Sequence, residues 1–197
     1  MSALGRSCPL PDVGPLTAEA GSQSAAASLI LGAMNHSPAP LCLHRETVRP
    51  EWIDYNGHMN VAYYLLAFDH ATDAVLDHFG IGKDYAETEG RSMFVVEAHL
   101  TYAREVTEGD GLTFASLVLG ADAKRLHLFH EMRHEEDGFL AATAEFVLVH
   151  VDLTERRSVP LSQETAERLA RTAAVHEGLP RPPQAGRSVG LRAPKGA

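Results

Sequence analysis

Residues 52–60, WIDYNGHMN, bring several chemically capable side chains together within one short stretch. Aspartate and histidine can act as general bases, nucleophiles or metal ligands. An ordinary turn accounts for the Asn-Gly pair at 56–57, and an ordinary helix N-cap accounts for Asn60. Neither explains Asp54 or His58. These two side chains are therefore the first candidates for chemistry.

Metal binding by this stretch is not expected. The order Asp54, Asn56 and glycine resembles the start of a calcium loop, but Leu65 occupies the position at which the bidentate acid is required. His58 and His70 are twelve residues apart in the sequence, with no evident third ligand. We therefore expect no metal and no cofactor.

The sequence after the turn predicts one long helix. From Val61 through Leu65 to Phe79, apolar residues recur at the i, i+3, i+4, i+7 spacing of one helical face, and Gly80 and Gly82 end the pattern. Such a helix has about five turns. Residues before the turn, at 43–52, predict a strand.

Strands and a second helix are predicted downstream. Four segments have strand patterns, at 92–103, 111–120, 125–134 and 139–152. Short turns rich in Gly and Asp join them, so successive strands must pair antiparallel. Ser162 can cap a helix running to about residue 178. We expect an α+β, hotdog-like arrangement, in which an antiparallel sheet wraps around one long helix.

Composition and charge limit the organisation and the partners. The 197 residues are 45% hydrophobic with a net charge of −9, which argues for one core and against nucleic acid. No apolar run is long enough for a membrane span, so a cytoplasmic location is expected. We expect a disordered leader at 1–40, the hotdog domain at 41–160, and a helix with a basic tail at 161–197. The open sheet edge favours a homodimer, with a tetramer as the alternative.

The segment DYNGHMNVAYY, residues 54–64, resembles the active-site segment of hotdog thioesterases of the hydroxybenzoyl-CoA type. That family has the pattern Asp-x-x-Gly-His-[Val/Met]-Asn-x-x-x-Tyr. The matching positions are Asp54, Gly57, His58, Met59, Asn60 and Tyr64. The resemblance continues through VVEAHLTYAREVTEGD and covers residues 43–152. Residues 43–192, including LPRPPQAGRSVGLR, also resemble the betainyl-CoA thioesterases associated with carnitine breakdown.

This resemblance implies hydrolysis of a short acyl-CoA thioester, which for the second group is betainyl-CoA. Asp54 would be the general base or the nucleophile, and the two roles stay open. Backbone N–H groups of Gly57 and Met59 would polarise the thioester oxygen. His58 has a catalytic or a structural role, and Asn60 belongs to the same catalytic segment.

Substrate recognition makes two further demands. A quaternary ammonium would need a carboxylate and aromatic faces, and the candidates are Glu97, Trp52, Tyr55, Tyr64 and Phe94. The alternative for Glu97 is a place on the solvent face of its strand. CoA is polyanionic and needs basic groups, for which the candidates are Arg91, Arg104, Lys124 and Arg125.

Two other functions remain open. Hotdog enoyl-CoA hydratases typically have Asp-x-Asn-Pro-x-His, whereas this sequence has Gly57 in place of the proline and a histidine one residue early. A non-catalytic acyl-CoA-binding hotdog protein is the other alternative. Asp54 argues against it, because a binding protein needs no carboxylate beside a thioester.

Overall fold

The computed structural model describes residues 38–191. Its helices and strands in chain order are β1 (Leu41–Thr47), the 3-10 turn η1 (Pro50–Trp52), α1 (Val61–His78), α2 (Lys83–Glu89), β2 (Arg91–Tyr102), β3 (Gly111–Ala121), β4 (Arg125–His134), β5 (Leu140–Asp152), β6 (Arg157–Ser158) and α3 (Gln163–Glu177). The leader predicted for 1–40 lies outside the described residues up to position 37.

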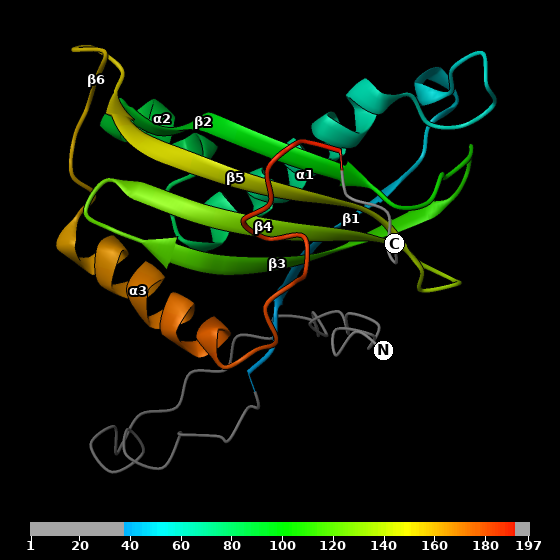
Figure 1. The fold of residues 1–197 in the computed structure, drawn as a ribbon. Helices are drawn as coiled ribbons and strands as arrows, with labels where there is room; N and C mark the ends of the chain where they lie inside the picture. Colours follow the sequence, from blue (N-terminus) through cyan, green and yellow to red (C-terminus); the bar gives the residue numbers. More distant parts are fainter. Residues whose placement is uncertain (1–37, 192–197) are drawn as a thin grey trace, which may run out of the picture.

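The sheet is antiparallel, with strand order β1-β3-β4-β5-β2, and the short β6 pairs with β5. It curls around α1, which covers one face, while α3 lies on the other side beside β3 (Figure 1). The predicted hotdog fold is thus confirmed. The first strand ends at Thr47 rather than at the predicted 52, because Pro50 begins the 3-10 turn.

Helix α1 begins where the sequence predicted. Asn60 is its N-cap, and the Asn60 Oδ1 atom accepts a hydrogen bond from the Ala62 N–H at 3.0 Å. The helix buries one stripe against the sheet, and Phe68 packs edge to face on Phe114 with the ring centroids 5.8 Å apart. Val61 and Leu65 are 58% and 45% exposed, so the predicted apolar face was wrong at these two positions.

A polar network joins α1 to the sheet inside this core. His130 on β4 is fully buried, with Nε2 3.2 Å from Thr72 Oγ1 and Nδ1 2.7 Å from Ser116 Oγ. The Thr72 hydroxyl donates to the Phe68 carbonyl at 2.9 Å, so Thr72 Oγ1 can accept the Nε2–H of His130. Burial lowers the pKa of His130 to about 3. The imidazole is therefore neutral at physiological pH.

The C-terminal part of the chain packs on the outer side of the sheet. Ser162 caps α3, as predicted, by accepting from the Thr165 N–H at 3.2 Å. His176 near the end of α3 accepts at Nδ1 from the Val118 N–H of β3 at 2.9 Å. Beyond α3, residues 179–191 cross the outer face (Figure 1), where the Gly186 N–H donates to Glu145 Oε2 at 2.7 Å.

The short helix α2, which has seven residues, was not predicted from the sequence. Cys42 on β1 forms part of a disulfide, which the spacing of the cysteines in the sequence does not indicate. No helix within residues 38–191 is both long and apolar enough to cross a membrane.

Candidate active site

The segment carrying Asp54 folds into a closed turn between η1 and α1. The Gly57 N–H donates to the Asp54 carbonyl at 3.0 Å, and the Asp54 N–H donates to the His58 carbonyl at 3.1 Å. Gly57 has a φ of 81°, in the left-handed region that glycine adopts without strain. The Asn-Gly pair therefore shapes the turn, and the turn displays Asp54 and His58.

The two ends of the turn are joined to each other, and one end is fixed to the domain. Ile53 and Met59 form an isolated antiparallel bridge, and the Asn60 N–H donates to the Trp52 carbonyl at 2.8 Å. The Met59 N–H donates to the Val106 carbonyl at 2.9 Å, which ties the turn to the segment following β2. These bonds hold Asp54 just ahead of the first turn of α1.

One oxygen of the Asp54 carboxylate is engaged locally. Asp54 Oδ1 accepts the Asn56 N–H at 2.8 Å, and the side chain is half-buried. Within the described chain, Oδ2 has no hydrogen-bond partner. A carboxylate oriented through one oxygen, with the second oxygen open, can take a proton from water or attack a carbonyl carbon.

The backbone donors of the turn are only partly available. The N–H groups of Gly57 and Met59, the two predicted oxyanion donors, already have the carbonyl acceptors described above. In the described part of the chain the His58 N–H lacks an acceptor. The His58 ring is half-buried, and Nδ1 lies 3.3 Å from the Met59 carbonyl oxygen. Donation from Nδ1 leaves Nε2 as an acceptor.

Three of the predicted aromatic residues lie at this end of the domain in different settings. Trp52 is buried and stacks on Tyr63, with ring centroids 5.6 Å apart and planes 14° apart. Tyr64 is buried edge to face against Tyr102 at 5.2 Å, and burial raises its pKa. Tyr55 is 96% exposed at the tip of the turn. Of these three, only Tyr55 presents open ring faces.

Glu97 and Phe94 lie on β2, at the open edge of the sheet. Both side chains are exposed, and a bulge between Val95 and Glu97 interrupts the pairing of β2 with β5. Tyr102, which contacts Tyr64, lies five residues beyond Glu97, roughly 17 Å along an extended strand. A single chain does not bring Glu97 together with the aromatic residues beneath the turn.

The predicted CoA-binding residues separate into two groups. Arg104 lies at the end of the sheet that carries the turn, with its guanidinium 3.9 Å from the ring centroid of Phe139. The other three, Arg91, Lys124 and Arg125, lie at the opposite end, around the start of β2 and the end of β5.

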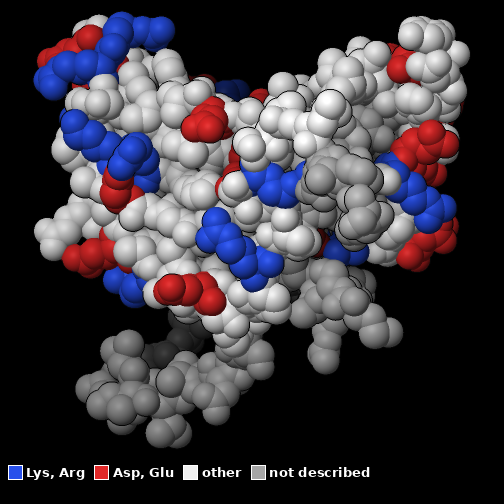
Figure 2. Space-filling view, in the orientation of Figure 1, with Lys and Arg blue, Asp and Glu red and all other residues white. Residues whose placement is uncertain are grey.

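Each residue of this second group has a local partner. Arg91 Nε is 3.9 Å from Asp152, Arg125 Nη2 is 2.7 Å from Asp122, and Lys124 Nζ donates to the Ser158 carbonyl at 3.4 Å. Figure 2 shows that lysine and arginine side chains are interspersed with acidic ones over the face of the molecule that is in view, including the corner at β6. These residues do not form a continuous basic surface in one chain.

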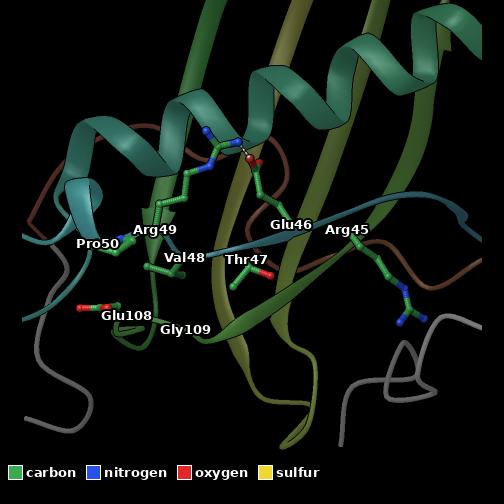
Figure 3. A pocket seen from close by; sticks show the side chains of 8 residues that line it. All are labelled: Arg45, Glu46, Thr47, Val48, Arg49, Pro50, Glu108 and Gly109. Atoms are coloured by element: carbon green, nitrogen blue, oxygen red, sulfur yellow. Dashed lines mark hydrogen bonds and ion pairs between the residues drawn. The ribbon is translucent and has the colours of Figure 1, made fainter.

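A surface hollow lies beside the turn rather than over Asp54. It has a volume of about 550 Å³, and Figure 3 shows its lining residues, which are Arg45, Glu46, Thr47, Val48, Arg49, Pro50, Glu108 and Gly109. None of these lining residues was predicted as a site residue from the sequence. The Arg49 guanidinium also lies 5.1 Å from the Trp52 ring centroid. Arg49 directly precedes Pro50 and the turn in the sequence, and this position was the one indication that it could lie at the site.

The curled antiparallel sheet, the enclosed helix, and the turn with an acid at the helix N-terminus together define the hotdog-fold class of thioesterases. Comparison with known families gives the same assignment. The chain belongs to the thioesterase-like superfamily, whose family model matches residues 48–169, and it is a thioester hydrolase.

Individual relatives cover most of the described residues. The chain is 40% identical over 151 residues to a betainyl-CoA thioesterase of Pseudomonas aeruginosa, an alignment spanning 77% of this chain and 95% of the relative. It is 42% identical over 150 residues to an L-carnitine dehydrogenase/betainyl-CoA thioesterase of Agrobacterium fabrum, covering 76% of this chain and 30% of that longer protein.

A solved structure is similar over nearly the same region. SAV2348 of Staphylococcus aureus, described in complex with CoA, has a TM-score of 0.68 and 29% identity. The match covers 78% of this chain and 98% of SAV2348.

Proposed function

We propose that this chain hydrolyses betainyl-CoA to glycine betaine and CoA in carnitine catabolism. The observation that carries the proposal is the position of Asp54, whose carboxylate is fixed by one hydrogen bond on a closed turn ahead of α1. The 40% identity to a betainyl-CoA thioesterase supports this choice of acyl group.

The reaction would use Asp54 and the donors around it. As general base, the carboxylate takes a proton from water while the water oxygen attacks the thioester carbon. As nucleophile, it forms a mixed anhydride that water then hydrolyses. In both routes the carbon–sulfur bond breaks, and the CoA thiolate leaves and is protonated. We assign stabilisation of the developing oxyanion to the His58 N–H, while Gly57 and Met59 use their N–H groups to hold the turn.

The active form would be a homodimer joined through the β2 edges. Val95 and Val96 are 43% and 60% exposed on this strand, and an open, apolar edge favours pairing with a second copy. Antiparallel pairing about the middle of β2 would set the Arg91 end of one chain beside the Tyr102 end of its partner. The basic group of each chain would then lie near the turn of the other, where CoA phosphates need cations.

Recognition of the cationic acyl group is assigned to Glu97 and Tyr55. Trp52 and Tyr64 are buried among core rings, so the open faces of Tyr55 are better placed for a cation–π contact. Glu97 provides an exposed carboxylate on the edge that the dimer would cover. Its proximity to the substrate therefore depends on the partner chain.

A matched pair of substrates tests the proposal. Betainyl-CoA and 3,3-dimethylbutanoyl-CoA have the same acyl shape, and only the first carries a positive charge. We expect release of free thiol from both, with a higher kcat/KM for betainyl-CoA. A preference for the neutral ester would overturn the betainyl assignment. Hydration of crotonyl-CoA in place of thiol release would favour the hydratase alternative.

A further inference from the structure

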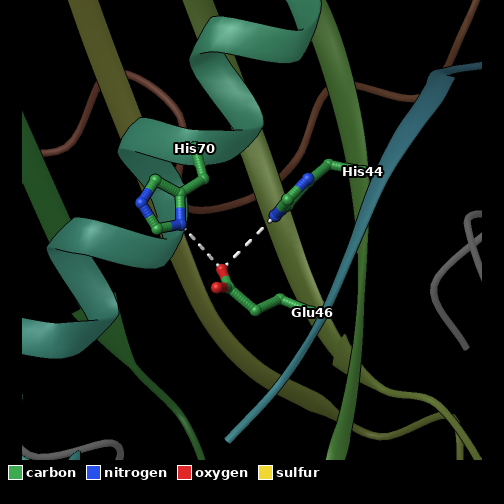
Figure 4. Close-up of side chains that lie close together, drawn as sticks. All are labelled: His44, Glu46 and His70. Carbon is green, nitrogen blue, oxygen red and sulfur yellow. Dashed lines mark hydrogen bonds and ion pairs between the residues drawn. The ribbon is translucent and has the colours of Figure 1, made fainter. Parts of the chain in front are cut away.

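A second cluster of chemically capable side chains lies between β1 and α1. His44 and Glu46 alternate onto one face of β1, and His70 from α1 meets them there (Figure 4). Glu46 Oε2 lies 2.9 Å from His70 Nδ1 and 3.3 Å from His44 Nε2. The three donor atoms all lie within 4.8 Å of one another. We call these residues the His-Glu-His cluster.

We propose that the His-Glu-His cluster binds one divalent transition-metal ion of the zinc type. Two imidazole nitrogens and one carboxylate oxygen are a donor set that Zn²⁺ uses, with an open position for water. In a tetrahedral site, metal–ligand bonds of about 2.0–2.2 Å place neighbouring ligand atoms about 3.3–3.6 Å apart. The two measured separations to Glu46 are close to this range, so binding requires small side-chain adjustments.

The surroundings of the cluster favour a cation and allow its entry. The Glu46 side chain is 8% exposed, whereas those of His44 and His70 are 23% and 34% exposed. Burial of the carboxylate strengthens its attraction for a metal ion, and the exposed edges of the imidazoles leave a path from solvent. Arg49 Nη2 lies 3.2 Å from Glu46 Oε1, which orients the carboxylate and leaves Oε2 directed at both imidazoles.

Helix α1 carries further negative charge, part of which acts on the cluster. Asp69, Asp73 and Asp77 are spaced at four-residue intervals along the helix. The Asp73 carboxylate interacts electrostatically with both His44 and His70. A divalent ion at the cluster would offset the negative charge of Asp73 as well as that of Glu46.

Metal binding here would cross-link the two elements that bracket the catalytic turn. Glu46 and His70 are 24 residues apart in the sequence, and the turn at 52–60 lies between them. The ion would take no part in the chemistry at Asp54. It would instead stabilise the attachment of β1 to α1, raising Tm by about 5–10 °C when free Zn²⁺ is 100 times Kd.

The experiment titrates untagged, metal-free protein with Zn²⁺ by calorimetry, and with Co²⁺ by visible absorption. We expect one ion per chain and imidazole-ligated Co²⁺ bands. Glu46→Gln, His44→Gln and His70→Gln should each weaken binding at least tenfold, in line with the loss of one ligand. His78→Gln, in the last turn of the same helix, is the matched control and should bind as the parent does.

The result that overturns the proposal is the absence of stoichiometric binding, or equal affinity in the parent and all three ligand variants. Circular dichroism and the metal-free Tm establish that each variant is folded. The Zn²⁺-dependent rise in Tm provides a second readout, which must disappear in folded ligand variants and persist in His78→Gln. A rise of equal size in the ligand variants would show that the metal binds elsewhere.

Discussion

The buried His130 should make the stability of the domain depend on pH. Its pKa is about 3 in the folded protein, against an ordinary value of 6.5. Because the unfolded chain takes up the proton first, the stability contributed by the neutral imidazole is complete above pH 6.5 and falls as pH decreases towards 3. The largest possible loss is about 5 kcal/mol, at about 1.4 kcal/mol per pH unit.

At about pH 5 this effect amounts to about 2 kcal/mol, a large share of typical domain stability. Protonation would also disturb the hydrogen bond in which Nδ1 accepts from the Ser116 hydroxyl at 2.7 Å. His176 contributes in the same direction, since its pKa is lowered by burial. A comparison with a His130 variant is therefore needed to isolate the contribution of His130.

The assay is urea unfolding at about pH 8, 6 and 5 for the parent, His130→Gln and the control His78→Gln. The His130→Gln variant should be less stable than the parent at pH 8, because it loses part of the hydrogen-bond network with Thr72 and Ser116. It should also lose about 2 kcal/mol less than the parent between pH 8 and pH 5. Identical pH dependence of the parent and His130→Gln would refute the reasoning.

Two predictions concern β2. Glu97→Gln should lower kcat/KM for betainyl-CoA about tenfold more than for 3,3-dimethylbutanoyl-CoA, because only the cationic ester loses a charge partner; equal losses in thiol-release assays would make Glu97 structural. Val96→Asp should shift the protein from dimer to monomer in sedimentation and reduce turnover, since it places a charge on the proposed interface. Val175→Asp, at a similarly exposed site on α3, is the control and should leave the oligomeric state and the turnover unchanged.

The fold followed from local signals that agree with one another. The turn was predictable because its determinants are contiguous: the Asn-Gly pair, the left-handed Gly57 and the Asn60 cap all act within a few residues. The short helix α2 gave a weaker signal, since its seven residues contain no buried side chain. Helical periodicity alone could not distinguish the covered face of α1 from exposed positions such as Leu65.

The candidate site was less predictable than the fold, because the arrangement of the strands in the sheet decides which residues come together there. Arg91 and Arg104 are close in sequence and lie at opposite ends of β2, so their separation follows from the length of that strand. In the sequence, His70 pairs with His58 as a possible ligand, and no third ligand is evident. The structure instead places His70 beside Glu46, through a contact between α1 and an edge strand that residue spacing does not reveal.

The role of Asp54 is tested most directly by single-turnover thioester hydrolysis with Asp54→Asn. Asparagine keeps an Oδ1 atom that can accept the hydrogen bond that the Asn56 N–H donates to Asp54 at 2.8 Å in the parent. The substitution removes the carboxylate that would act as base or nucleophile. We predict a fall in rate of about 10²-fold or more, with the unfolding midpoint nearly unchanged, while Asp84→Asn on α2 retains parental activity. Turnover of betainyl-CoA by folded Asp54→Asn at nearly the parental rate would contradict the assignment of the chemistry to this turn.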